Sequence, residues 1–91
     1  MTDAVERSVR IMNRAGLHAR PAAEFVKIAA RFVAEIELVR GGIRVNGKSI
    51  MGVLMLAAER GAEITIKATG SDSPEALDAL VDFVERGFGE D

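Results

Sequence analysis

Hydrophobic and polar residues alternate in four short stretches of the chain, and each stretch predicts a half-buried strand. In the first, from Val5 to Met12, polar residues separate Val5, Val9 and Ile11. The other stretches are 34–38, 43–45 and 62–68. Successive side chains of a strand point to opposite faces, so each stretch should bury one face only.

Turn signals lie on both sides of the third predicted strand. Gly41-Gly42 precedes it, and because glycine accepts the positive φ angles of tight turns, the second and third strands should form a hairpin. Asn46-Gly47 follows it with the turn chemistry that ends a strand.

From Ala19 to Val33 the apolar residues recur with the period of a helix. This spacing places them on one helix face, formed by Ala22, Phe25, Val26, Ala29, Phe32 and Val33. A shorter helix is predicted from about residue 49 to about residue 58, with Ser49 as its N-cap and Gly61 just past its end. Gly52 weakens this short helix.

A third helix should begin near Ser71. Asp72 with Glu75 fits a capping box, Ser73 is an alternative cap, and Pro74 is tolerated in a first turn. Gly87 should end this helix, and residues 89–91 are expected to fray. Its apolar face consists of Leu77, Leu80, Val81 and Val84.

The predicted order is strand, helix, strand, strand, helix, strand, helix. It indicates an α+β fold in which helices cover one face of a single sheet. The 91 residues are enough for one domain, and no repeat or linker divides them, so residues 1–91 should form a single domain. With four Phe, no Trp and no Tyr, the core must be mainly aliphatic.

Composition excludes several kinds of chemistry. The absence of cysteine removes disulfides, thiolate catalysis and cysteine-based zinc sites, and one histidine cannot build a multi-histidine metal site. We therefore expect no metal and no cofactor. The polar N-terminal residues lack a signal-peptide pattern, and no apolar run approaches the roughly 20 residues of a membrane span. A cytoplasmic protein without membrane insertion is expected.

The charge distribution argues against nucleic acid as a partner. The net charge is −2, and the aromatic residues that would stack on bases are scarce. The first quarter of the chain is nevertheless basic, which favours an anionic ligand or an acidic partner there. Its basic residues are Arg7, Arg10, Arg14 and Arg20.

The only histidine, His18, lies where a loop meets the first predicted helix. The first amides of a helix lack internal partners, and the helix dipole favours an anion beside them. Pro21 fits the first turn, and Arg20 adds a permanent positive charge. Together these features form a site for a dianionic group at His18. Neutral imidazole is also nucleophilic, so His18 could carry such a group on its ring. From this chemistry alone, an ordinary surface or capping histidine remains the alternative.

A second stretch of interest runs from Gly42 to Ser49 and formally matches the phosphate-binding pattern G-x-x-x-x-G-K-S. We reject this match because residues 43–45 read as a strand and the chain lacks the large sheet of a nucleotide-binding domain. One interpretation is that Ser49 serves only as the N-cap of the short helix. The other is that Ser49 is also a phosphorylation site. Phosphorylation of Ser49 would place a charge of roughly −2 at the helix start. An apolar patch of Ile50, Met51 and Leu54 lies beside it in the sequence.

Taken together, the two stretches resemble HPr, the histidine-containing phosphocarrier family of the phosphoenolpyruvate-dependent phosphotransferase system. Residues 16–22, Gly-Leu-His-Ala-Arg-Pro-Ala, resemble the active-site motif of the family. Residues 48–52, Lys-Ser-Ile-Met-Gly, resemble its regulatory-serine motif at the expected spacing. The likeness extends to Gly61-Ala62-Glu63-Ile64 and to Ala76-Leu77, and so over nearly the whole chain.

The resemblance implies an open-faced sandwich of four antiparallel strands and three helices. It implies that His18 accepts a phosphoryl group on Nδ1 from phosphorylated enzyme I and donates it to an enzyme IIA. Arg20 would stabilise the phosphohistidine. Such a protein is a stoichiometric carrier rather than an enzyme, and a monomer is the default expectation.

By the same resemblance, Ser49 would be the target of an ATP-dependent HPr kinase/phosphorylase. Ile50, Met51 and Leu54 match the patch on which partners dock. Residues 56–58 and 87–91 resemble NPr, the nitrogen-branch relative, so sugar transport and a regulatory branch both stay open. The rival hypotheses are a regulatory binding module controlled at Ser49 and a small nucleic-acid-binding domain.

Overall fold

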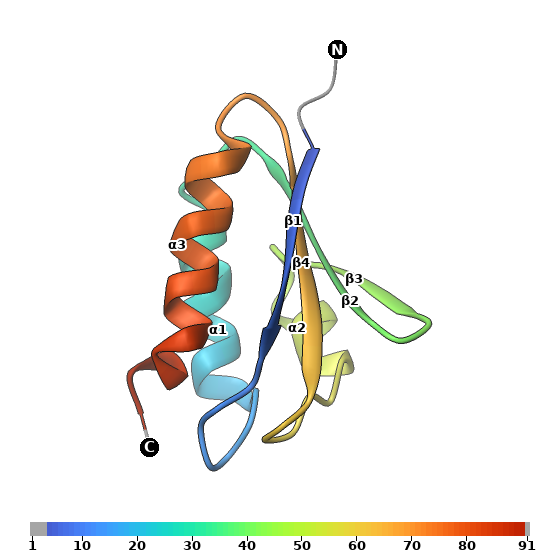
Figure 1. Cartoon of the computed structure of the whole chain (residues 1–91), viewed down its shortest axis with the longest axis vertical. Coiled ribbons are helices and arrows are strands. Elements are labelled where there is room, and N and C mark those ends of the chain that lie inside the picture. The colour runs from blue at the N-terminus through green and yellow to red at the C-terminus, as the bar shows by residue number, and fades with distance from the viewer. Residues whose placement is uncertain (1–3, 91) are drawn as a thin grey trace.

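The computed structural model describes residues 4–90 and contains the predicted sequence of elements (Figure 1). The elements are β1 (Ala4–Arg10), α1 (Ala19–Ala29), β2 (Glu35–Arg40), β3 (Ile43–Asn46), α2 (Ile50–Met55), β4 (Glu63–Thr69) and α3 (Ser73–Glu85), followed by a short 3₁₀ turn, η1 (Gly87–Gly89). No helix within residues 4–90 is long and apolar enough to cross a membrane.

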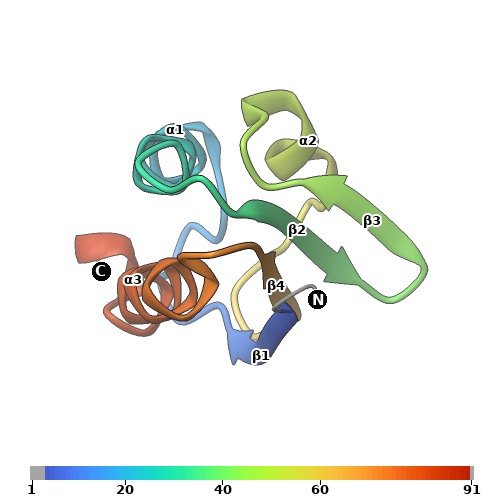
Figure 2. The ribbon, with the colours of Figure 1, turned by 90° about the horizontal axis from the view of Figure 1, so that it is seen from above.

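The four strands form one antiparallel sheet in the order β1-β4-β2-β3. All three helices lie on the same side of this sheet, and the other side is open (Figures 1 and 2). The predicted fold class, an open-faced α+β sandwich, is therefore confirmed. The predicted hairpin is confirmed as well, because β2 and β3 pair up to Arg40 and Ile43, with Gly41 in the turn at φ +57°.

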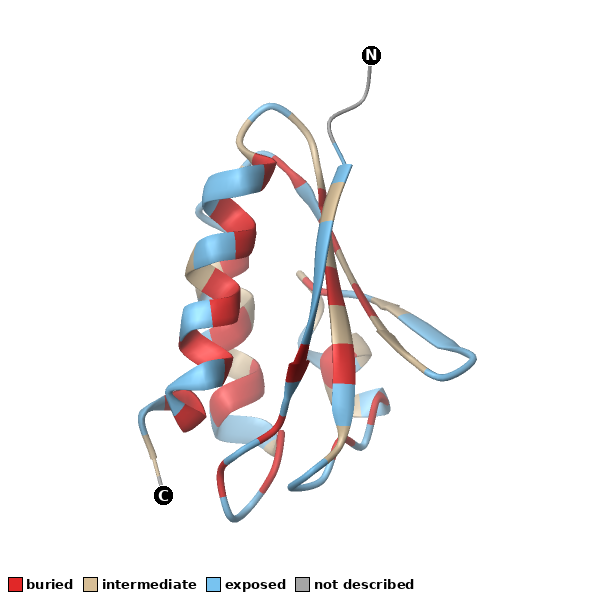
Figure 3. Cartoon of the chain, viewed as in Figure 1, coloured by how far each residue is buried: buried red, intermediate tan, exposed pale blue. Residues whose placement is uncertain are grey.

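The core lies between the sheet and the helices (Figure 3). In β4, Ile64, Ile66 and Ala68 are buried, while their neighbours in sequence are not. They pack in one cluster with Phe25 of α1 and Leu80 of α3. Burying an apolar side chain of this size contributes about 1.5–3 kcal/mol, so the alternation in the strands decides which sheet face the helices cover.

Helix α1 is shorter than its apolar pattern predicts. It ends at Ala29 rather than Val33, and Val33 is 81% exposed instead of buried on the helix face. The amides of Arg31 and Phe32 bond three residues back, which tightens the chain into turns. These turns redirect the chain into β2.

Helix α2 also ends early, at Met55 rather than near Ala58. Ala57 adopts a left-handed conformation at φ +49°, which ends the helix without the predicted glycine. Gly61 lies further along, where its amide donates to the carbonyl of Ile11. At Gly52, an added Cβ would come within 3.0 Å of the Asn46 carbonyl oxygen. Gly52 thus allows the close approach of α2 to β3.

The predicted capping box of α3 is wrong. Helix α3 begins at Ser73 with Pro74 in its first turn, but the Asp72 side chain makes no capping bond to it. The Asp72 carboxylate instead accepts hydrogen bonds from the amides of Val33 and Ala34, both at 2.8 Å. It therefore holds the chain between α1 and β2. The bond from Val33 is the main reason that the pKa of Asp72 lies below its usual value.

This carboxylate should make stability depend on pH in a defined direction. A folded-state pKa below the unfolded one, about 3.9, stabilises the fold above that pH, and the stabilisation is lost as the pH falls. We expect Asp72→Asn to lower the free energy of unfolding at pH 7, by a margin that shrinks toward pH 3 in urea titrations. Asp78→Asn is the control, because within residues 4–90 the Asp78 carboxylate forms only an exposed ion pair, with Arg7 at 3.7 Å. If the difference in free energy of unfolding between the wild type and Asp72→Asn did not change with pH, the charge of Asp72 would not be what stabilises the fold.

Candidate functional site

His18 lies at the junction of a loop and α1, as the sequence predicts. It is the N-cap residue of α1, and its carbonyl accepts the first helical hydrogen bond, from the Ala22 amide. The amides of Ala19 and Arg20 have no hydrogen-bond partner within residues 4–90. These free donors and the positive end of the helix dipole favour an anion next to the imidazole.

The loop before His18 rests against a second loop, residues 56–62, that joins α2 to β4. The Leu17 amide donates to the Ala58 carbonyl at 2.9 Å. Gly16 has φ +72°, and a Cβ there would lie 2.8 Å from the Ala58 oxygen. Both the conformation and the close contact require glycine. The backbone on which His18 stands is therefore fixed by residues about 40 positions away in the sequence.

Glu90, near the C-terminal end, completes the surroundings of the histidine. One oxygen of its carboxylate, Oε1, lies 2.8 Å from Nε2 of His18. The same oxygen accepts a hydrogen bond from Nδ2 of Asn13 at 2.7 Å, and Nδ2 also donates to the Gly16 carbonyl at 2.8 Å. Both partners of Nδ2 are acceptors, which fixes the orientation of the Asn13 amide. Asn13, Glu90 and the Gly16 carbonyl thus form one connected network beside the ring.

The Glu90 contact distinguishes the two ring nitrogens of His18. A carboxylate only accepts hydrogen bonds, so Nε2 must carry a proton when it bonds to Glu90. In the neutral imidazole the lone pair is then on Nδ1. Nδ1 has no hydrogen-bond partner among the described residues, and the His18 side chain is 41% exposed against 17% for Glu90. The nucleophilic nitrogen is free while the orienting carboxylate is sheltered.

A buried aromatic residue brings Glu90 to this position. Phe88 is 8% exposed and packs edge-on against Phe83 with ring centroids 5.3 Å apart. It has φ +59°, which is uncommon for a residue with a side chain, and together with Gly87 and Gly89 it turns the chain back toward α1. The expectation that residues 89–91 fray is wrong for Gly89 and Glu90, whereas Asp91 lies outside the described residues.

The electrostatics of the site follow from these contacts. The pKa of Glu90 is lowered chiefly by its hydrogen bond with His18, then by that with Asn13, and less by the charge of Arg20. Arg20 itself is exposed and makes no hydrogen bond or ion pair within residues 4–90. Arg20 therefore acts on the site through its charge rather than through a contact.

Ser49 is the N-cap of α2, as predicted. Its Oγ accepts a hydrogen bond from the Gly52 amide at 3.1 Å. The neighbouring Lys48 donates from Nζ to the Phe32 carbonyl at 2.7 Å, which ties the start of α2 to the turns that follow α1. Ser49 and His18 lie at opposite ends of α2, because it is the loop after the C-terminal end of α2 that contacts Leu17.

The apolar residues of α2 lie between these two ends. Ile50 and Met51 are exposed, Met51 at 70%, whereas Leu54 is half-buried against the core. Sequence reasoning missed two further exposed methionines, Met55 on α2 and Met12 in the loop before His18. Within the described residues, no group of three or more His, Asp or Glu side chains is arranged to hold a metal ion.

Comparison with known proteins agrees with this architecture. The family model described as the PTS HPr component phosphorylation site matches residues 5–86. The phosphocarrier protein HPr of Treponema pallidum is 48% identical over 96% of this chain and 99% of its own length. The crystal structure of HPr from Thermoanaerobacter tengcongensis superposes with a TM-score of 0.91 at 44% identity, covering 96% of this chain and 98% of the other.

The chain belongs to the HPr family, the phosphocarrier proteins of the phosphotransferase system. One relative in the comparison was crystallised as a dimer. Crh of Bacillus subtilis, crystallised as a swapped dimer, matches with a TM-score of 0.75 at 43% identity, covering 91% of this chain and 95% of the other.

The contact between Glu90 and His18 predicts a shift that NMR can measure. In a His18→Ala variant, the pKa of Glu90 should rise toward the ordinary glutamate value, since the contact that lowers it most is lost. The measurement is a pH titration of the side-chain carboxyl carbons. Asn13→Ala should raise the pKa by less, and Glu85, exposed at the end of α3, is the internal reference. An unchanged Glu90 titration in His18→Ala would show that the contact is absent in solution.

Proposed function

We propose that His18 carries the phosphoryl group of this phosphocarrier on Nδ1. The observation that carries the proposal is the Glu90 contact at Nε2, which leaves the lone pair on Nδ1 of a residue that directly precedes the free amides of α1. The Nδ1 lone pair attacks the phosphorus of the phosphorylated donor. The Nδ1–P bond forms as the bond from phosphorus to the donor breaks, and the donor retains that electron pair. Transfer to the acceptor reverses these roles.

The donor that we propose is phosphorylated enzyme I, and the acceptor is an enzyme IIA. In each cycle one copy of the chain accepts one phosphoryl group from the donor and gives it up to the acceptor, so it takes part as a stoichiometric carrier rather than as an enzyme. The positive charge of Arg20 and the amides of Ala19 and Arg20 would stabilise the phosphoryl group while it resides on the ring.

The docking surface that we propose for both partners is the apolar patch of Ile50, Met51 and Leu54. Two of these side chains are exposed on a helix that adjoins the His18 loop. Exposed apolar side chains beside a reactive group are suited to brief association with several partners, and methionine adapts to different surfaces. Arg14 and Arg20, before and after His18 in the sequence, are both exposed and favour acidic partner surfaces.

We also propose that the protein acts as a monomer in the cytoplasm. Strand β1 pairs with β4 of its own chain along all seven residues, so the sheet is complete without a second copy. The absence of cysteine is compatible with a reducing compartment.

Labelling with phosphoenolpyruvate tests the transfer at His18. Incubation with enzyme I and labelled phosphoenolpyruvate should add a single phosphate that is lost in acid, because the nitrogen–phosphorus bond is acid-labile. His18→Ala should take up none. Ser49→Ala is the matched control and should be labelled like the wild type. Equal labelling of His18→Ala would refute the assignment.

A second proposal, supported by the cap geometry, is that phosphorylation of Ser49 regulates docking. Ser49 lies next to Ile50 and Met51, and a phosphate on Oγ would place roughly two negative charges beside that patch. The helix start favours a negative charge, so the modified serine can be accommodated without unfolding α2. The enzyme that we propose for this step is an ATP-dependent HPr kinase/phosphorylase.

The cap and the modification can be measured separately at Ser49. Ser49→Ala should lower the free energy of unfolding by about 1 kcal/mol, because the Gly52 amide loses its acceptor. It should also abolish the acid-stable label that kinase and ATP add to the wild type. Ser71→Ala, at an exposed turn, is the control for both measurements. Persistent acid-stable label on Ser49→Ala would place the modification at another residue.

A further inference from the structure

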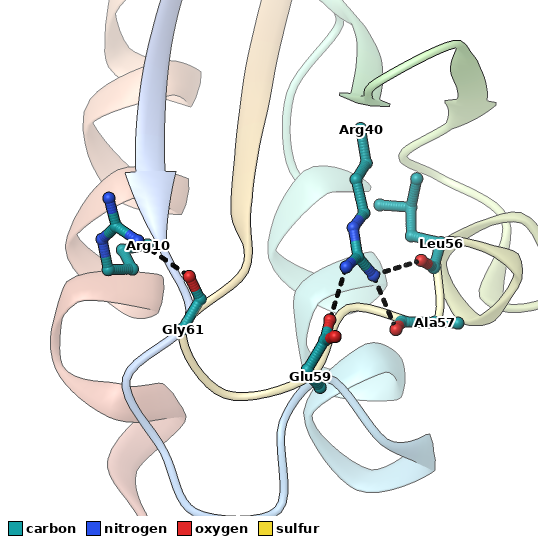
Figure 4. A network of polar contacts seen from close by, with 6 residues as sticks. All are labelled: Arg10, Arg40, Leu56, Ala57, Glu59 and Gly61. Carbon is teal, nitrogen blue, oxygen red and sulfur yellow. Dashed lines mark hydrogen bonds and ion pairs between the residues drawn. The ribbon is translucent and has the colours of Figure 1, made fainter.

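Two arginines from different strands hold the loop 56–62 that supports the His18 backbone (Figure 4). Arg40 of β2 donates to the carbonyls of Leu56 and Ala57, at 3.1 and 2.8 Å, and forms an ion pair with Glu59. Arg10 of β1 donates to the Gly61 carbonyl at 2.8 Å. The loop is thus held near both of its ends by charged donors on the sheet.

The Arg40 contacts satisfy groups that the fold leaves without partners. Helix α2 ends at Met55, so the carbonyls of Leu56 and Ala57, just past its end, have no continuing helix to bond them. The left-handed Ala57 turns its carbonyl away from the helix axis, toward β2. The planar guanidinium of Arg40 reaches both carbonyls and the Glu59 carboxylate together, and its side chain is only 31% exposed.

The residue after Ala57 is the one that contacts the His18 loop. The Ala58 carbonyl accepts from the Leu17 amide, and the Ala58 and Glu59 backbone lies against Gly16. The interactions of Arg40 are therefore with the residues on both sides of Ala58, and Leu17 directly precedes His18. A movement of Ala58 would move the backbone that directs the imidazole.

We propose that Arg40 is a positioning residue for phosphoryl transfer at His18, acting through Leu56, Ala57 and Glu59 on the Ala58–Leu17 hydrogen bond. The inference rests on the proposed transfer at His18 and deepens it. The hydrogen bonds and the ion pair of Arg40 are with the loop, and not with the His18 imidazole or with the apolar patch proposed for docking. Arg40 keeps the reacting nitrogen in one orientation, so its loss should slow the transfer step and leave docking intact.

The test compares Arg40→Gln with Arg44→Gln. Arg44 lies on the neighbouring strand β3. Among the residues that the structure describes it pairs only with Glu37, at 3.0 Å on the open sheet face, so its substitution removes the same charge away from the loop. In the unphosphorylated protein, hydrogen exchange at the Leu17 amide should accelerate about tenfold in Arg40→Gln, without matching acceleration at the core amide of Ile66. Arg44→Gln should leave both amides unchanged.

The second readout is the rate of transfer from phosphorylated enzyme I. Arg40→Gln should lower the rate at saturation about tenfold with an unchanged half-saturating concentration, because docking residues are untouched. Arg40→Lys should recover part of the rate, since an ammonium can donate to the carbonyls but lacks the planar fork. Arg40→Lys also provides the test of the transfer rate if Arg40→Gln does not fold.

The outcomes separate this inference from the proposed function. Leu17 exchange and transfer rates equal to those of Arg44→Gln would overturn the role of Arg40, whether or not His18 is phosphorylated. Equal acceleration at Leu17 and Ile66 would also overturn it, because it would indicate general destabilisation. Phosphorylation of His18→Ala would refute the proposed function. The hydrogen exchange of the Leu17 amide would still show whether Arg40 holds the loop that supports the His18 backbone.

Discussion

Burial on one side of the sheet is the constraint on which the structure depends. Each strand has one apolar face, so all three helices must pack on the same side. Consequently the connection from β1 into α1, the loop from α2 into β4 and the turn after α3 come together at one end of the molecule (Figure 1). The site is assembled where these three connections meet.

At this end, backbone contacts do most of the positioning. The Leu17 amide bonds to the Ala58 carbonyl, and Gly16 allows the two chains to touch. Side chains then add direction: Glu90 orients the ring of His18, and Asn13 holds Glu90. A helix start by itself would offer an anion site of general kind. The three segments convert it into a site in which one ring nitrogen is distinguished from the other.

Much of the fold could be predicted from local patterns in the sequence. Alternation located the strands, the Gly41-Gly42 pair located the hairpin, and Ser49 marked the start of α2. The end of α1 could not be predicted, because Val33 continues the helical spacing. The turns at Arg31 and Phe32 and the bonds to Asp72 together lead the chain away from the helix. Asp72 is the N-cap residue of α3, as its local pattern predicts, but its carboxylate bonds to amides about 40 residues distant instead of capping the helix.

The position of His18 at the start of α1 was predictable from the sequence, whereas the residues around it were not. His18 and Ser49 belong to motifs that are continuous in the sequence, whereas Glu90 and Arg40 act across long sequence separations. The glycines on both sides of Phe88 favour a frayed chain end, which is what the sequence predicts for residues 89–91. The signal for order was the aromatic residue itself, since a Phe that finds a buried position can fix the residues that follow it.

The place of Glu90 has a practical consequence for how the protein is handled. A purification tag or fusion partner joined after Asp91 would begin two positions after Glu90, whose carboxylate contacts His18. The start of β1 lies at the opposite end of the sheet, where Ala4 pairs with Thr69. Tags and fluorescent labels therefore belong at the N-terminus, because a C-terminal fusion would disturb the contact between Glu90 and His18.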